Sequence, residues 1–168
     1  KTAKQMQFST MVFAGDQMQL VSVKAVSDSY PLRGRLILRQ TEAFDAAIVP
    51  EFKPGEVFLE PRLLQLLQIK TGDFIEVGVS QLKVAGIIAE EPDAPLSVFG
   101  NAPRLLMHVD DVAATEVIQP GSRIGYRYLF AGNSADLERF EQALTPALSV
   151  QTLRMIAPSS TATPALGA

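Results

Sequence analysis

The sequence has 168 residues, a formal net charge of −3 and no cysteine, which excludes disulfides, thiolate metal sites and thiol nucleophiles. No basic face is concentrated enough to predict nucleic-acid binding. The longest apolar run, residues 84–89, is about six residues long, whereas a membrane-spanning helix needs about 20, so no helical span is expected.

The composition is that of a globular domain. Hydrophobic residues make up 47% of the chain and charged residues 20%. A chain of 168 residues buries about 70% of its unfolded surface, so it can hold a core without metal or disulfides. The first residue is Lys1 and no signal peptide precedes it, so we expect a piece of a longer protein.

Two β-rich runs flank residues 15–16, and the Gly-Asp pair between them predicts an antiparallel hairpin. In the second run, one face carries Val21, Val23 and Ala25. Residues 27–34 then combine Ser, Asp, Pro and Gly, which favour a turn. A short strand is expected at residues 35–39.

Residues 61–72 give the clearest helix signal. Pro61 suits the first helical position, and Gly72 suits the C-terminal cap. An apolar stripe is expected from Leu63, Leu66 and Leu67, with Leu64 beside it.

Residues 73–89 predict a second hairpin, with its turn near residues 78–81. The first strand would place three apolar side chains on one face, namely Ile75, Val77 and Val79. At the far end of the hairpin, the acidic residues Glu90, Glu91 and Asp93 are expected to be solvated.

The segment 92–103 holds three prolines and one glycine, which predicts a loop. It also carries Leu96, Val98 and Phe99, more apolar surface than a loop in solvent needs. We expect these three residues to contact a partner or a hydrophobic ligand, since exposed apolar clusters mark such sites. The alternative, that they tuck under the loop and fill a satellite core, stays open.

The last third of the sequence alternates strand and helix signals. A strand from residue 104 is followed by a short helix that Asp110 or Asp111 would cap. Residues 122–132 predict a strand that places four side chains on one face, namely Ile124, Tyr126, Tyr128 and Phe130.

Residues 133–144 predict a capped amphipathic helix that turns Leu137, Phe140 and Leu144 inward. A strand at residues 148–155 would close the fold. The small residues of 158–168 are typical of a linker.

The sequence contains no recognisable catalytic pattern. It has no phosphate-binding glycine loop and no GxSxG motif, and its single histidine, His108, lies in an apolar run. A packing role for His108 is therefore favoured over a role as a catalytic base. No metal site and no cofactor is predicted, because no His or carboxylate spacing matches a common site.

Two groups of arginines could hold a lipid headgroup or an acidic partner. They are Arg33, Arg35 and Arg39, and Arg123 with Arg127. Solvated arginines on half-exposed strands are the favoured alternative for both groups.

Two stretches carry a family resemblance. "VSVKAVSDSYPLRGRL" and "EVFLEPRLLQLLQIKTGDFIEVGVSQLKVAGIIAEEPD" are similar to the periplasmic domains of FtsX-like ABC transporter permeases, in particular the YbbP-like subgroup. The matching residues include 23–26, 30–34, 72–73, 86–88 and 91–93. The resemblance covers about residues 1–155, with its blocks in the family's order.

The resemblance implies an α+β fold with a two-lobed, MacB-like periplasmic core. Residues 1–45 and 115–157 would form an α+β (porter-like) lobe, residues 46–114 an inserted, smaller β-rich lobe, and residues 158–168 a linker toward the next membrane helix. In the family a further strand and helix come first, and this chain starts downstream of them.

The resemblance also implies a function, the non-catalytic extracytoplasmic domain of a permease at the periplasmic side of the bacterial inner membrane. A separate cytoplasmic ATPase subunit would supply the energy, a periplasmic esterase or thioesterase would be a partner, and the cargo would be hydrophobic and lipid-like. A free-standing periplasmic module that binds a ligand or a protein is the alternative. A hydrolase with an unusual site comes third.

Overall fold

A computed structural model describes residues 1–148 except 44, 50 and 93–101. The chain divides into two units, Lys1–Ala131 and Gly132–Ala168. The lobe boundaries expected after residues 45 and 114 stay a prediction.

The first unit is built mainly of β-strands. They are β1 (Thr2–Ala14), β2 (Gln17–Val26), β3 (Ile37–Arg39), β4 (Glu56–Leu59), β5 (Phe74–Val77), β6 (Ser80–Glu90), β7 (Arg104–His108) and β8 (Gly125–Phe130). Two helices accompany them, α1 (Pro61–Leu67) and α2 (Val112–Thr115), the second preceded by a 3₁₀ turn at Val109–Asp111. This mixture of strands and few helices is of the α+β class.

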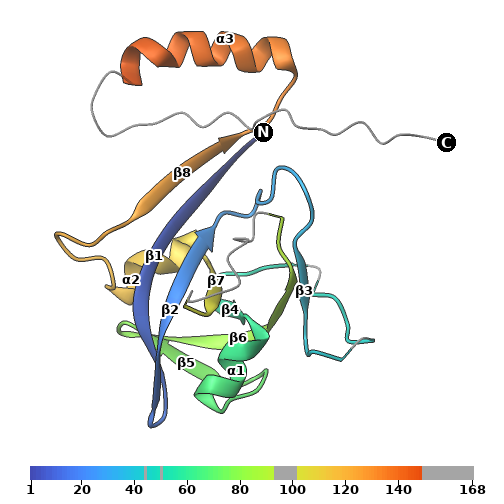
Figure 1. The fold of residues 1–168 in the computed structure, drawn as a ribbon, viewed down its shortest axis with the longest axis vertical. Coiled ribbons are helices and arrows are strands. Elements are labelled where there is room, and N and C mark those ends of the chain that lie inside the picture. Colours follow the sequence, from blue (N-terminus) through green and yellow to red (C-terminus); the bar gives the residue numbers. More distant parts are fainter. Residues whose placement is uncertain (44, 50, 93–101, 149–168) are drawn as a thin grey trace. The chain divides into compact units, whose positions relative to one another are not determined.

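Six strands form a closed circuit in the order β2-β7-β4-β6-β5-β1, because β1 also pairs with β2 (Figure 1). The β2–β7 and β4–β6 pairs are parallel, and the other pairs of the circuit are antiparallel. Two strands lie outside the circuit: β3 pairs with β6, and β8 pairs with the first half of β1. We call the paired segment formed by Thr2–Gln7 of β1 and by β8 the extension.

Both predicted hairpins are confirmed, with turns of two residues each. Ala14 pairs with Gln17 across the first turn, and Val77 pairs with Ser80 across the second. Each turn begins with a glycine of positive φ, +56° at Gly15 and +59° at Gly78, a conformation that glycine adopts without steric cost. Val79 lies in the second turn and is 71% exposed, so the prediction that it shares the buried face of β5 is wrong.

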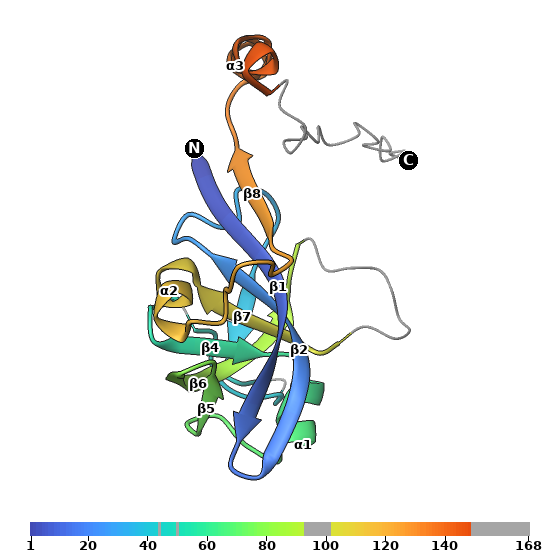
Figure 2. The same ribbon diagram turned by 90° about the vertical axis from the view of Figure 1, so that its left-hand side faces the viewer.

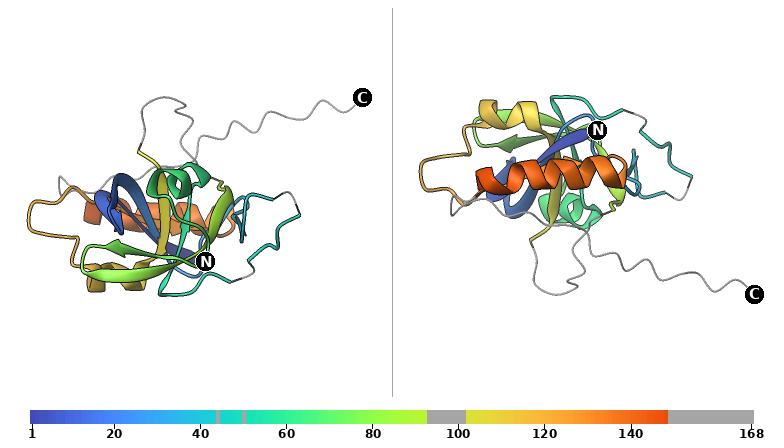
Figure 3. Two further views of the ribbon diagram at one scale, coloured as in Figure 1. Left: turned by 90° about the horizontal axis from the view of Figure 1, so that it is seen from below. Right: turned by 90° about the horizontal axis from the view of Figure 1, so that it is seen from above.

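Within the circuit, β4 and β7 are buried on both faces, because successive side chains of a strand point to opposite sides. In β7, Leu105 and Met107 belong to one buried cluster and Leu106 to another. In β4, Phe58 joins the cluster of Leu106, while its two neighbours join the other. The first cluster also receives side chains from α1 and α2, which approach from different sides of the circuit (Figures 2 and 3).

Helix α1 begins at Pro61, as predicted, but it is shorter than expected. Leu63 and Leu67 are buried one turn apart, while Leu66, at the flank of that stripe, is 44% exposed. The helix ends at Leu67, and its C-cap residue Gln68 takes the left-handed conformation at φ +54°. Gly72 belongs to the turn before β5, so the predictions of Leu66 in the stripe and of Gly72 as the cap are wrong.

The described part of the second unit consists of α3 (Ser134–Leu144) and a 3₁₀ turn at Thr145–Leu148. The Asn133 side chain caps α3 by accepting a hydrogen bond from the Asp136 backbone N–H at 2.8 Å, which confirms the predicted cap. The three apolar residues expected to face inward are only half-buried, namely Leu137, Phe140 and Leu144. The strand expected at 148–155 lies outside the described residues except for Leu148.

Among the described residues, no helix is long and apolar enough to cross a membrane.

Candidate functional site

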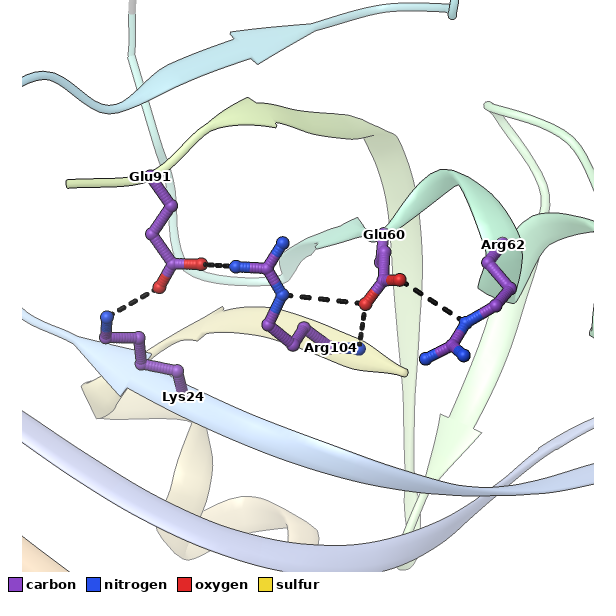
Figure 4. A network of polar contacts seen from close by, with 5 residues as sticks. All are labelled: Lys24, Glu60, Arg62, Glu91 and Arg104. Atoms are coloured by element: carbon purple, nitrogen blue, oxygen red, sulfur yellow. Dashed lines mark hydrogen bonds and ion pairs between the residues drawn. The ribbon is translucent and has the colours of Figure 1, made fainter. Parts of the chain in front are cut away.

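The two ends of the segment 92–103 are tied together by charge. Glu91 follows β6, and Arg104 is the first residue of β7. The Glu91 carboxylate contacts the Arg104 guanidinium with one oxygen, Oε2, and lies 2.5 Å from Lys24 Nζ with the other (Figure 4). One carboxylate therefore bridges two cations from β2 and β7. We call this contact between Glu91, Lys24 and Arg104 the clasp.

The clasp continues toward the start of α1. Arg104 Nε lies 3.5 Å from Glu60 Oε2, and the Arg104 backbone N–H donates to the same oxygen at 3.0 Å. Glu60 Oε1 in turn lies 3.3 Å from Arg62 Nε. Positive and negative groups thus alternate along five side chains, as Figure 4 shows. These side chains come from β2, the end of β6, β7 and the start of α1.

Burial changes along this row of charges. The side chains of Lys24 and Glu91 are 9% and 4% exposed, whereas that of Arg62 is 52% exposed. Lys24 also donates a 2.9 Å hydrogen bond to the Tyr30 hydroxyl, and its Nζ lies 4.9 Å from the centre of that ring. A buried charge is costly unless it is paired and hydrogen-bonded, so the inner end of the row depends on its pairing.

The prediction of a solvated Glu91 is wrong. Local sequence places it in an acidic hairpin end, but the sheet brings Lys24, 67 positions earlier in the sequence, against it. The signal that could have found this contact is Lys24 itself, a lysine in the middle of a buried apolar strand. A charge at such a position needs a partner of opposite sign.

His108 is buried and both of its ring nitrogens are in use. Nδ1 accepts a 3.2 Å hydrogen bond from the Asp110 backbone N–H, so the ring proton sits on Nε2, which donates to Asp28 Oδ1 at 2.8 Å. The ring also tilts against Phe52, with 5.9 Å between the centroids. These contacts agree with the packing role favoured for His108.

The helix cap predicted from Asp110 or Asp111 takes another form. Asp111 stands at the N-cap position of α2, but its side chain makes no capping bond there. Instead, Asp111 Oδ2 accepts a 2.7 Å hydrogen bond from the Gly55 backbone N–H and so holds the entry to β4. The His108 ring takes the local capping role at the preceding 3₁₀ turn.

The predicted contact residues Leu96, Val98 and Phe99 lie outside the described residues, and their role stays a prediction. Of the candidate arginines, Arg33 and Arg35 are exposed, and Arg39 Nη1 donates to the Ala46 carbonyl at 3.1 Å. Within the ranges that the structure describes, no group of three or more His, Cys, Asp or Glu side chains is placed to hold a metal ion.

The predicted apolar face of β8 exists but is largely uncovered by the unit to which it belongs. Ile124, just before the strand, packs against the first core cluster. Tyr126 and Tyr128, which follow on the same face, are 59% and 60% exposed. The alternation of the strand was predictable, whereas the absence of a covering layer in this unit was not.

No protein-family model matches the chain. Over 150 residues, however, the chain is 47% identical to an uncharacterized ABC transporter permease, YbbP, of Escherichia coli (strain K12). The chain belongs to the ABC transporter permeases. The aligned stretch covers 88% of the chain and 18% of that permease, so the chain spans less than a fifth of its relative.

The fold of this permease domain is similar to that of a solved structure, the periplasmic region of MacB from Actinobacillus actinomycetemcomitans. The TM-score is 0.56 over 88% of the permease domain and 66% of the MacB chain, at 14% sequence identity. Because the sequence identity is only 14%, this likeness is evidence for the fold alone. Together the two likenesses confirm the expected family and the expected α+β, MacB-like fold of the permease domain.

Proposed function

We propose that the chain is a non-catalytic part of a permease that lies at the periplasmic side of the bacterial inner membrane. A separate cytoplasmic ATPase subunit supplies the energy, and the domain couples ATP hydrolysis to the movement or extraction of a hydrophobic, lipid-like substrate. The observation that carries this proposal is the 47% identity to a permease over 88% of the chain. In this proposal, residues 1–45 and 115–157 form one lobe, residues 46–114 form the inserted lobe, and residues 158–168 are a linker toward the next membrane helix.

The geometry supports a mechanical role over a catalytic one. The clasp joins β2, the end of β6 and the start of β7, and its continuation reaches α1, so a force on the segment 92–103 passes directly into the sheet. His108, the single histidine, has both ring nitrogens engaged by Asp28 and the Asp110 backbone, which leaves neither to activate a serine.

The coupling can be tested in the full-length permease reconstituted with its ATPase subunit in lipid nanodiscs. We expect replacement of this domain by a short flexible linker to abolish ATP-dependent release of a fluorescent lipid while ATP hydrolysis persists. The matched control is the intact permease with an ATPase subunit inactivated in its catalytic carboxylate, which should lose both activities. Undiminished lipid release without the domain would contradict the proposal.

The predicted partner is a periplasmic esterase or thioesterase that contacts Leu96, Val98 and Phe99. We expect Val98→Asp and Phe99→Asp each to weaken capture of the enzyme by the full-length permease. Exposed Asp16, at the first hairpin turn, offers a control in Asp16→Asn. Equal capture by all three variants would remove this contact from the proposal and leave the transport role to its own test.

A further inference from the structure

A hollow of about 440 Å³ lies between the first hairpin and the connection from α2 to β8. Gln7, Phe8 and Ser9 of β1 and Ser22 of β2 form one wall, and residues from 117 to 124 form the other. All of them belong to the first unit. Ligand pockets are commonly of about 300–1,000 Å³, so the hollow is large enough for a small amphiphile.

One part of this lining is polar. Ser9 and Ser22 pair with each other on the face of the hairpin opposite to Phe8 and Val23, and their hydroxyls make no hydrogen bond with the described residues. Arg123 is exposed at the rim. No carboxylate of the described residues lies within ion-pair distance of Arg123, and none lines the hollow. Its local charge is therefore positive in a chain whose net charge is −3.

The other part of the lining is apolar. Val117, Ile118 and Ile124 are half-buried and pack against the first core cluster, which fixes them as a firm wall. An apolar wall beside a free guanidinium suits a ligand with a hydrocarbon tail and an anionic head.

A second hollow, of about 500 Å³, lacks this combination of an apolar wall and an uncompensated positive charge. It is also partly apolar, through residues such as Leu36 and Phe52. However, the carboxylates of Asp28 and Glu51 line it, and Lys53 lies 3.3 Å from Glu51 and is compensated by it. An anionic head would meet repulsion there and attraction at Arg123.

We propose that the hollow at Arg123 binds the anion of a medium-chain fatty acid, with the carboxylate at Arg123 and the alkyl chain against Val117 and Ile118. The inference rests on the proposed function only in that it narrows the lipid-like cargo to a chemical class. Binding itself is a property of this chain and is measured without transport.

The test is a titration of the isotopically labelled 168-residue chain with decanoate below its micellar concentration, followed by backbone amide NMR. We expect saturable shifts at residues 7–9, 22 and 117–124. Decanol lacks the charge and acetate lacks the tail, so both should bind more weakly, and decyltrimethylammonium should not bind there. Equal shifts with the cationic and anionic amphiphiles, or shifts centred on the hollow at Asp28, would overturn the proposal.

Two variants separate a specific contact with Arg123 from nonspecific attraction to positive charge. We expect Arg123→Gln to weaken decanoate binding about fivefold to tenfold, the range for one partly solvated charge-assisted contact. Arg127→Gln makes the same charge change on β8 outside the lining and should leave the affinity unchanged. Equal weakening in both variants would show only attraction to net charge and would reject the site.

A second pair uses exposed Ser9, where replacement carries little risk of unfolding. Ser9→Asp adds a carboxylate to the lining of the hollow and should weaken decanoate binding, while Ser9→Asn should retain it. If Ser9→Asp binds decanoate as the parent chain does, the head group is not there. If the parent chain does not bind decanoate while the full-length permease releases lipid, this site alone is rejected. If the parent chain binds decanoate while the permease releases no lipid, the transport role alone is rejected.

Discussion

Strand β1 passes through two environments that share the same backbone pairing. In the closed circuit its residues Phe8 and Val12 are 7% and 0% exposed and belong to the first core cluster. In the extension, its first residues pair with β8, whose Tyr126 and Tyr128 are more than half exposed on the side that continues the core face. Regular strand pairing is therefore common to both regions, whereas the core face is covered in the circuit and open at Tyr126 and Tyr128.

The inward side of β1 also changes along its length. Ala3 and Gln5 are buried on one face of the strand, while Phe8 and Val12 are buried on the other. The change occurs where β1 leaves the extension and enters the circuit. Stability should therefore be concentrated in the circuit, and substitutions of the same kind should separate the two regions.

The largest contrast is expected for aromatic truncation. Phe58→Ala removes a fully buried ring from the circuit and should lower the free energy of unfolding by about 3–5 kcal/mol. Tyr128→Ala removes an exposed ring from the extension and should change it by no more than about 0.5 kcal/mol. Urea unfolding followed by circular dichroism measures both, and similar losses would show that the extension is packed as tightly as the circuit.

Charge neutralisation tests the clasp. Glu91→Gln leaves Lys24 and Arg104 without their shared carboxylate and should cost about 3 kcal/mol, near the lower end for breaking a buried ion pair. Glu60→Gln acts at the more exposed part of the same row and should cost about 1 kcal/mol or less. Both values come from thermal and urea unfolding, and the reverse order would place the strong contact at Glu60.

The smallest contrast concerns two glycines within strands. A Cβ at Gly86, in the circuit, would lie 2.1 Å from the Arg39 carbonyl oxygen, so Gly86→Ala should cost about 2 kcal/mol. A Cβ at Gly125, in the extension, would meet its nearest atom at 3.8 Å, and Gly125→Ala should stay within about 0.5 kcal/mol of the parent. Melting temperatures suffice here, and a stable Gly86→Ala would mean that β3 shifts away easily.

Local chemistry made some of these features predictable. The two hairpin turns depend on glycines next to regular strands, and the start of α1 depends on Pro61, so short stretches of sequence contain the whole signal. The MacB-like fold was predictable through a family resemblance and not through periodicity. Periodicity found most of the strands, but it found neither β4 nor the closed circuit in which the strands pair.

Long-range contacts decided what sequence reasoning missed. Glu91 and Lys24 are 67 positions apart in the sequence, and Arg104 and Glu60 are 44 positions apart. A local sequence pattern therefore identifies neither pair of partners. Arg123 was singled out as a basic residue, but its companions in the hollow, Ser9 and Ser22, come from a distant hairpin. The exposure of Tyr126 and Tyr128 depends on which layer lies above a strand, and alternation cannot report that.

The clasp has a consequence for the evolution of the segment 92–103. Glu91 and Arg104 hold the two ends of this segment together. The contact between them therefore offsets much of the entropic cost of bringing those ends close. When the two ends of a connecting segment are fixed, doubling its length costs only about 0.6 kcal/mol. The clasp should therefore let the length and sequence of this segment change while the sheet beneath keeps its fold.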